Sequence, residues 1–134
     1  MLLPVDSTVA VIDGEKLRLF RNTGEPGAPK LVALEEPELS SENKSSGSRH
    51  SSSSANNNDS RLDEDSFVVA VVGWLNTQAL GKGFEELAVI AAPKSLGELR
   101  KHYHKALEAK IVVELAKDLT GHSTADIEVA LAKA

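Results

Sequence analysis

Residues able to do chemistry follow three apolar segments of the chain. They are Asp13, after segment 8–12, Lys94 and Ser95, after segment 87–92, and Asp118, after segment 111–115. If these segments are neighbouring strands, the side chains gather beyond the carboxyl ends of the strands. Open α/β sheets bind ligands there, at a switch in strand order. Two chemistries suit such a group: metal-dependent hydrolysis and anion binding.

Asp13 is the residue that favours a metal-dependent nuclease. Nucleases of the ribonuclease H-like kind hold two divalent metals with several carboxylates, which clamp the attacking and leaving oxygens. The segment ending Ala91-Ala92-Pro93 supplies no carboxylate, so Asp13 would be the single acid of that cluster. The alternative is that Asp13 opens an Asp-Gly turn, which its own side chain stabilises.

Lys94 and Ser95 favour anion binding, because the free backbone N–H groups at a helix start attract phosphate or carboxylate. The interval from Lys94 to Lys110 holds five Lys or Arg residues, Arg100 among them, against two Glu, in a chain of net charge −5. This local excess favours a nucleic-acid or acidic-protein surface. The alternative is a solvated helix face on which Lys105 and His104 pair with Glu108.

Other chemistries find no support in the residue pattern. The chain has no cysteine, which excludes disulfides and thiolate metal sites. His102 and His104 are two positions apart and point to different faces of a helix, which disfavours a shared metal. Neither a Gly-x-Ser-x-Gly nucleophile elbow nor a glycine-rich phosphate-binding motif occurs. We therefore predict no catalytic residue, no metal and no cofactor.

The apolar pattern predicts the elements that must position these residues. In chain order they are strands over 8–12, 16–21 and 31–34, a helix starting near Asp63, a strand over 87–92, a helix opened by a Ser95–Glu98 capping box and running through Leu107, a strand over 111–115, and a helix capped by residues 123–126. Asp13-Gly14 predicts a type I′ hairpin between the first two strands.

The first predicted helix carries Phe67, Ala70, Val71, Trp74 and Leu75 at helical spacing as its inner stripe, which Val68, Val69 and Val72 widen. Its apolar run ends at Leu75 and is too short to span a bilayer. The N-terminal residues do not resemble a signal peptide. We therefore expect a cytoplasmic protein without membrane insertion.

Residues 40–60 differ from the rest of the chain. Ten of these 21 residues are Ser and four are Asn, and none is large and apolar. Such a segment cannot bury enough surface to offset its ordering entropy, so we predict a disordered loop. A loop of this length inside a compact domain is either a binding or regulatory element or a tolerated low-complexity insertion.

The element order predicts one α/β domain over residues 1–134, with the loop at 40–60 between the third strand and the first helix. Three antiparallel strands followed by right-handed α/β crossovers are typical of the ribonuclease H-like arrangement. We therefore expect three layers in the order β-β-β-α-β-α-β-α, around a mixed five-stranded sheet of order 3-2-1-4-5.

Three stretches carry a resemblance to a known family. They are Val11-Ile12-Asp13-Gly14, the segment Ala91-Ala92-Pro93-Lys94-Ser95-Leu96-Gly97-Glu98-Leu99-Arg100, and Lys117-Asp118-Leu119-Thr120. Together they are similar to the host attachment family of proteobacteria, over nearly the whole chain except the Ser/Asn loop. The resemblance adds Gly97 and Thr120 to Asp13, Lys94, Arg100 and Asp118 as candidate binding residues. Each has a structural alternative: Gly97 would let a helix approach the sheet, and Arg100 would pair with an acid such as Asp118.

The host attachment family is related to the middle domain of archaeal and eukaryotic peptide-chain release factors. In those factors a Gly-Gly-Gln loop between the third strand and the first helix acts at the peptidyl-transferase centre. This chain has Gly47-Ser48-Arg49 in that loop and no Gly-Gly-Gln. The resemblance thus implies a non-enzymatic module that binds protein or structured RNA, with a ribosome- or tRNA-associated role as the alternative and a nuclease as a more distant one. No small-molecule ligand is implied.

Overall fold

The structure is a computed structural model that describes residues 3–25, 27–37, 39, 59–81 and 83–133. For residues 59–65 it describes the backbone alone. Its elements are β1 (Thr8–Ile12), β2 (Leu17–Asn22), β3 (Leu31–Leu34), α2 (Asp59–Leu80), β4 (Leu87–Ala91), α3 (Pro93–Arg100), α4 (Lys105–Glu108), β5 (Ile111–Ala116) and α5 (Thr124–Lys133). The predicted α/β class is confirmed, and α4 is an additional short helix.

The strands form one five-stranded sheet of order β3-β2-β1-β4-β5, as predicted. β2 is antiparallel to both β1 and β3, whereas β1, β4 and β5 are mutually parallel. Every residue of β1 and β4 is buried, because these two strands lie at the centre of the sheet and are covered on both faces.

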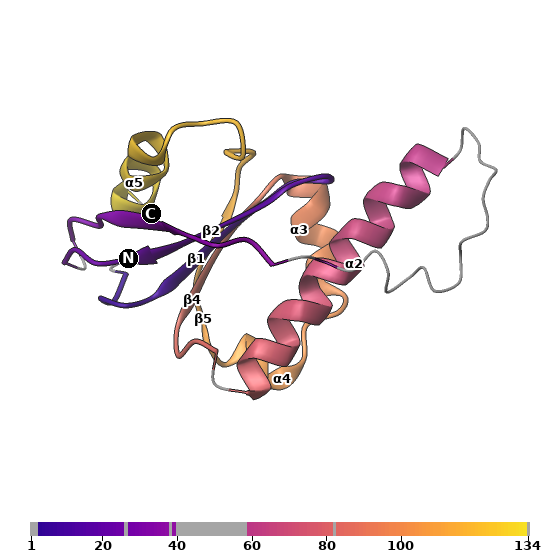
Figure 1. Cartoon of the computed structure of the whole chain (residues 1–134), viewed down its shortest axis with the longest axis horizontal. Coiled ribbons are helices and arrows are strands. Elements are labelled where there is room, and N and C mark those ends of the chain that lie inside the picture. The colour runs from indigo at the N-terminus through magenta and orange to yellow at the C-terminus, as the bar shows by residue number, and fades with distance from the viewer. Residues whose placement is uncertain (1–2, 26, 38, 40–58, 82, 134) are drawn as a thin grey trace.

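The sheet separates two apolar clusters, which makes three layers (Figure 1). On one face α2, α3 and α4 cover residues such as Ile12, Leu17 and Val89. On the other face α5 covers Val11, Phe20 and Ile90. The strand that follows β1 in the chain, β2, lies on one side of the β1–β4 pair, whereas the strand that follows β4, β5, lies on the other side. The carboxyl ends of β1 and β4 therefore form the switch point expected from the sequence.

Helix α2 begins at Asp59, earlier than the Asp63 predicted, and its buried stripe is rotated from the predicted one. Val68, Val71, Val72, Leu75 and Ala79 are buried, whereas Phe67, Ala70 and Trp74 are half-buried and Val69 is 44% exposed. The rotation follows from the run of valines, which makes several stripes equally apolar, so packing against the sheet decides between them.

The second predicted helix is two helices in the structure. α3 begins at Pro93 with Ala92 as its N-cap, and no side chain caps it, so the predicted Ser95 capping box is wrong. A proline suits the first helical position because its missing N–H would have no partner there. Ser95 lies inside α3 and is buried.

The break between α3 and α4 has two polar causes. His104 caps α4, its Nδ1 accepting a hydrogen bond from Ala106 N at 2.9 Å. Asn76 of α2 donates to His102 O at 3.0 Å and accepts from His104 N at 2.9 Å. These bonds satisfy backbone groups that a continuous helix would have paired internally.

The β1–β2 connection differs from the predicted type I′ turn. No described glycine has a positive φ, whereas that turn type requires positive φ at both central positions. Instead Asp13 N donates to Lys16 O at 3.0 Å, and the Asp13 carboxylate accepts hydrogen bonds from the backbone N–H groups of Glu15 and Lys16 within the turn. The reason is that an aspartate side chain can replace the backbone acceptor of a tight turn.

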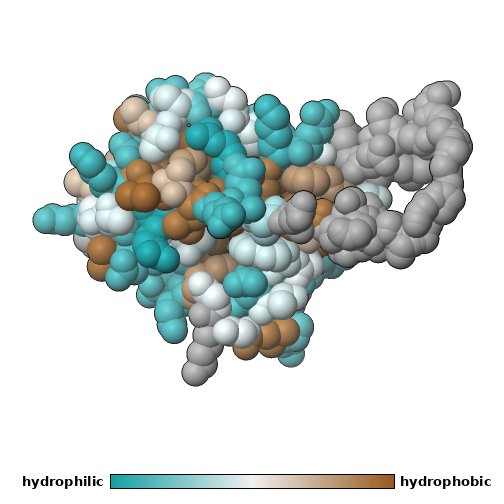
Figure 2. All heavy atoms as spheres, viewed as in Figure 1, coloured by the Kyte–Doolittle hydropathy of each residue, from teal (hydrophilic) through white to brown (hydrophobic). Residues whose placement is uncertain are grey.

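The predicted disordered loop at 40–60 falls on residues 40–58, which lie outside the described residues, while Asp59 and Ser60 belong to α2. On the face seen in Figure 2, hydrophobic surface is broken into separate patches by hydrophilic side chains. Within the described ranges, no helix is both long enough and apolar enough to cross a membrane.

Candidate functional site

The predicted site residues follow three strand ends that lie side by side. Ile12 is in register with Ala91, and Ala91 is in register with Ala116. Asp13, Pro93 and Asp118 therefore follow neighbouring strands at the carboxyl ends of those strands, as the sequence predicted. Their side chains nevertheless divide into two groups, one at the end of β1 and one on the surface of α3.

The Asp13 carboxylate is fully engaged by donors from the chain itself. Its Oδ1 accepts from the backbone N–H groups of Glu15 and Lys16, both at 2.6 Å. Its Oδ2 accepts from the Thr120 hydroxyl at 2.7 Å. One side chain thus holds the β1–β2 turn closed and ties it to the loop between β5 and α5.

Thr120 links Asp13 to the second candidate acid. Its Oγ1 also lies 3.1 Å from Asp118 Oδ1, so two carboxylates share one hydroxyl proton, with the shorter contact to Asp13. Thr120 is buried, whereas Asp118 is exposed. The structure therefore brings together the candidates Asp13 and Asp118, which follow strand ends, and Thr120, which the family resemblance added.

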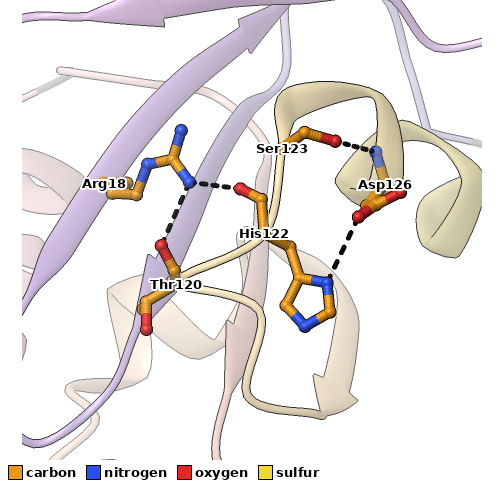
Figure 3. A network of polar contacts seen from close by, with 5 residues as sticks. All are labelled: Arg18, Thr120, His122, Ser123 and Asp126. Carbon is orange, nitrogen blue, oxygen red and sulfur yellow. Dashed lines mark hydrogen bonds and ion pairs between the residues drawn. The ribbon is translucent and has the colours of Figure 1, made fainter.

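Arg18 of β2 holds the backbone of the same loop (Figure 3). Its Nη1 donates to Thr120 O at 3.1 Å and to His122 O at 2.8 Å. The guanidinium carbon lies 5.0 Å from the centroid of the Phe20 ring. Sequence reasoning missed this residue, although an arginine two positions from a phenylalanine on a strand signals that the two share a face.

Beyond the loop, Ser123 and His122 organise the start of α5. Asp126 N donates to Ser123 Oγ at 3.1 Å, which confirms the predicted cap (Figure 3). His122 Nδ1 lies 3.3 Å from Asp126 Oδ2, and both side chains are about half exposed or more. The contact is one helical turn apart and belongs to the surface of the helix.

The Asp13 side chain has a lowered pKa. Partial burial raises it, but the hydrogen bonds from Thr120, Glu15 and Lys16 and the nearby Lys16 charge together outweigh that effect. A carboxylate whose oxygens accept these hydrogen bonds serves to hold the β1–β2 turn and the β5–α5 loop together. Across the described residues, no three His, Asp or Glu side chains are grouped so that they could hold a metal ion. We call Asp13, Arg18, Asp118 and Thr120 the Asp13 cluster.

A groove of about 590 Å³ adjoins the Asp13 cluster. Leu17, Pro37, Leu39 and Phe67 supply its apolar walls, and Glu15, Lys16, Arg18, Glu36 and Thr120 its polar ones. Two acidic and two basic side chains line it, so the charges of the groove balance and select neither anions nor cations.

The second group of candidates lies on the exposed side of α3. This side consists of Pro93, Lys94, Gly97, Arg100 and Lys101, which follow helical spacing, and we call it the α3 face. A Cβ built on Gly97 meets no atom within 4 Å. The prediction that Gly97 lets the helix approach the sheet is therefore wrong, because this glycine faces solvent.

Arg100 pairs with an acid, as the structural alternative expected, but the acid is Glu114 of β5 and not Asp118. Its Nη2 and Nε donate to Glu114 Oε1 at 2.6 Å and 3.1 Å, and the Tyr103 hydroxyl donates to Oε2 at 2.9 Å. The hydrogen bond and charge of Glu114 raise the pKa of Arg100. Burial and the bond to Glu114 raise the pKa of Tyr103 far above its usual value. The strand spacing that turns Glu114 toward the helices could have signalled this partner.

The other charges of α3 are arranged around Glu98. Its carboxylate lies 3.4 Å from Lys101 Nζ and 3.5 Å from His102 Nε2, and these contacts lower the pKa of Glu98. The ion pairs of the described residues do not include the expected contacts of Lys105 and His104 with Glu108, because His104 caps α4 instead. Within the same residues Lys94 forms no ion pair.

Comparison with known families gives a match over most of the chain. Residues 6–131 match the model of a family described as "Bacterial archaeo-eukaryotic release factor family 12". No curated protein matches the chain. The match confirms the release-factor relationship expected from the sequence and does not support the host attachment name. Since it covers almost the whole chain, the protein belongs to the bacterial archaeo-eukaryotic release factor family 12.

Proposed function

We propose that this protein is a release-factor-like module that binds the RNA backbone of the translation machinery through the α3 face. The observation that carries the proposal is the composition of that face. Lys94, Arg100 and Lys101 surround the exposed Gly97. Arg100 and Lys101 pair with Glu114 and Glu98 beside the face, whereas Lys94 forms no ion pair within the described residues. Family membership supports the choice of a translational partner.

The charge distribution supports RNA over an acidic small molecule. Lys94 and Lys101 lie two turns, or about 10 Å, apart on one side of a helix, so they would contact different phosphates of one backbone rather than share a single anion. The chain as a whole has a net charge of −5, so attraction of a polyanion requires a local basic surface such as the α3 face. Binding of this kind weakens steeply as salt increases, because it depends on counterion release.

The free-energy cost of a glycine at position 97 supports the proposal that the α3 face is a contact surface. An interior helical glycine is about 0.5–1 kcal/mol less favourable than alanine. Since a Cβ would meet no atom of the described residues, the helix gains nothing from the missing side chain. A bare backbone between cationic side chains lets a phosphate or ribose approach the helix closely.

The proposed module acts by binding. The chain sequence contains no Gly-Gly-Gln, and the segment that would carry that motif falls on residues 40–58, outside the described part of the chain. A translational partner implies the cytoplasmic location expected from the sequence. A part in host attachment and a nuclease activity stay predictions of the sequence, and neither explains the composition of the α3 face.

Co-sedimentation with purified bacterial ribosomes at low salt tests the proposal. We expect the wild type to pellet with ribosomes and K94Q/K101Q to bind about tenfold more weakly, with a shallower dependence on salt. The matched control is K30Q/K133Q, which removes two exposed lysines outside the α3 face and should bind as the wild type does. Absence of ribosome association at low salt, or equal binding by K94Q/K101Q, would overturn the proposal.

A further inference from the structure

We propose that the free edge of β5 is a second binding site, which takes an extended, lysine- or arginine-bearing peptide segment of a partner protein. A groove of about 510 Å³ runs along this edge. Residues 111–114 of β5 line it together with Arg100, Tyr103 and Glu108. The site shares Arg100 with the α3 face but differs in chemistry, because Ile111, Val112 and Val113 line it together with two acidic side chains, Glu108 and Glu114.

The two edges of the sheet are built differently. β3 has four residues, lies between Pro29 and Pro37, and its Leu31 N–H donates to Glu128 Oε2 of α5 at 2.7 Å. Short length, flanking prolines and a capped amide are devices that prevent an edge from pairing with another strand. The β3 edge is therefore closed to a partner.

The β5 edge has none of these devices within the described residues. It has six residues and is paired on one side with β4. In the described residues, no side chain outside the sheet bonds the backbone of residues 111–116. An extended peptide laid along such an edge gains backbone hydrogen bonds at strand spacing, which is the usual mode of β-strand addition.

The far wall of the groove is already ordered. Glu114 projects from β5 toward the helices, where Arg100 and Tyr103 bond both of its carboxylate oxygens. The Tyr103 ring is half-buried beside Ile111 at the edge of the helix-side apolar cluster. A peptide would therefore meet a preformed wall and lose little affinity to ordering side chains.

The charges and side chains of the groove select the occupant. Ile111, Val112 and Val113 offer apolar contact, and Glu114 is neutralised by Arg100. This leaves Glu108, which is exposed and forms no ion pair within the described part of the chain. One unpaired carboxylate beside an apolar strand edge attracts a basic side chain of the peptide and repels RNA.

A second copy of the chain is a poorer occupant. Two β5 strands paired antiparallel about the Val113–Glu114 bond would place Lys110 opposite Lys117 at both ends. Like charges directly opposite one another destabilise a strand pair. The peptide of another protein carries no such restriction.

A strand-forming peptide of alternating threonine and valine, with one lysine at its centre, tests the site on the isotope-labelled full chain. We expect it to shift the amide resonances of β5 and to slow their hydrogen exchange, while those of β3 stay unchanged. The same peptide with a glutamate in place of the lysine should bind about fivefold more weakly. A version with a proline beside the lysine should not bind, because it cannot complete the ladder.

E108K should weaken binding of the lysine peptide about fivefold, and the matched control E35K, an exposed charge reversal near the opposite edge, should not. Binding of the proline peptide, or shifts confined to the α3 face or β3, would overturn the proposal. So would protection of β5 in the free protein together with a dimer in light scattering, which would identify a second copy as the occupant. K94Q/K101Q should retain peptide binding, so failure at one site is distinguishable from failure at the other.

Discussion

Sequence patterns mark most residues of the Asp13 cluster and of the α3 face as functional, but Asp13 and Lys94 use their polar groups in opposite ways. Asp13, Thr120 and Arg18 direct their polar atoms to one another and to nearby backbone groups. Lys94 and Gly97 make no such contact in the described residues. The difference teaches that a polar group satisfied by its own chain belongs to the fold, whereas an unpaired or costly residue on the surface calls for a partner.

Removing the Asp13 side chain should have the largest effect on stability. Asp13→Ala loses three hydrogen bonds to one carboxylate, so we expect unfolding to become easier by about 2–3 kcal/mol. Denaturant unfolding followed by circular dichroism measures the change. Asp118→Ala is the control and should change stability by less than about 0.5 kcal/mol, because the exposed Asp118 makes only the longer contact to Thr120. Equal losses for both variants would mean that the hydroxyl proton belongs to both acids alike.

Arg18→Met should have the next largest effect. The variant keeps much of the apolar stem but loses two bonds to loop carbonyls and the contact with the Phe20 ring. We expect a loss of about 2 kcal/mol in the same unfolding measurement. Arg21→Met is the matched control, because Arg21 is exposed on the same strand and should contribute little. A stable Arg18→Met variant would show that the β5–α5 loop holds its place without β2.

The charge of Asp13 should make a smaller, pH-dependent contribution. Because hydrogen bonds lower the pKa of Asp13 in the folded state, the stability that its charge adds is present above the ordinary value of 3.8. That stability is lost as the pH falls through the lowered folded pKa. The difference in unfolding free energy between wild type and Asp13→Asn should therefore be constant from about pH 7 to about pH 5 and shrink below about pH 4. A difference that grew on acidification would contradict the assignment.

The strands were predictable, because their burial follows from local composition. β1 and β4 are apolar on both faces and occupy neighbouring interior positions of the sheet, as this pattern requires. The helix break after Arg100 was not predictable, since it depends on Asn76, which is distant in sequence. The same holds for the site. The Asp13–Thr120 contact joins residues 107 positions apart, and the Arg100–Glu114 pair joins a helix to a strand face. Sequence patterns named the reactive residues but not their partners.

Gly97→Ala is the smallest change and the sharpest test of the comparison. Since the added Cβ meets no atom within 4 Å, the variant should be more stable than the wild type by about 0.5–1 kcal/mol. On the proposed function, the same methyl group stands between the helix and the RNA backbone and should weaken ribosome binding severalfold. Gly73→Ala is the matched control, because Gly73 lies on the exposed side of α2 and a Cβ built there also meets no atom within 4 Å. It should raise stability by a similar amount and leave ribosome binding unchanged. If both variants gain stability and both bind as the wild type does, then Gly97 is a tolerated helix glycine, and the α3 face owes any affinity to its lysines alone.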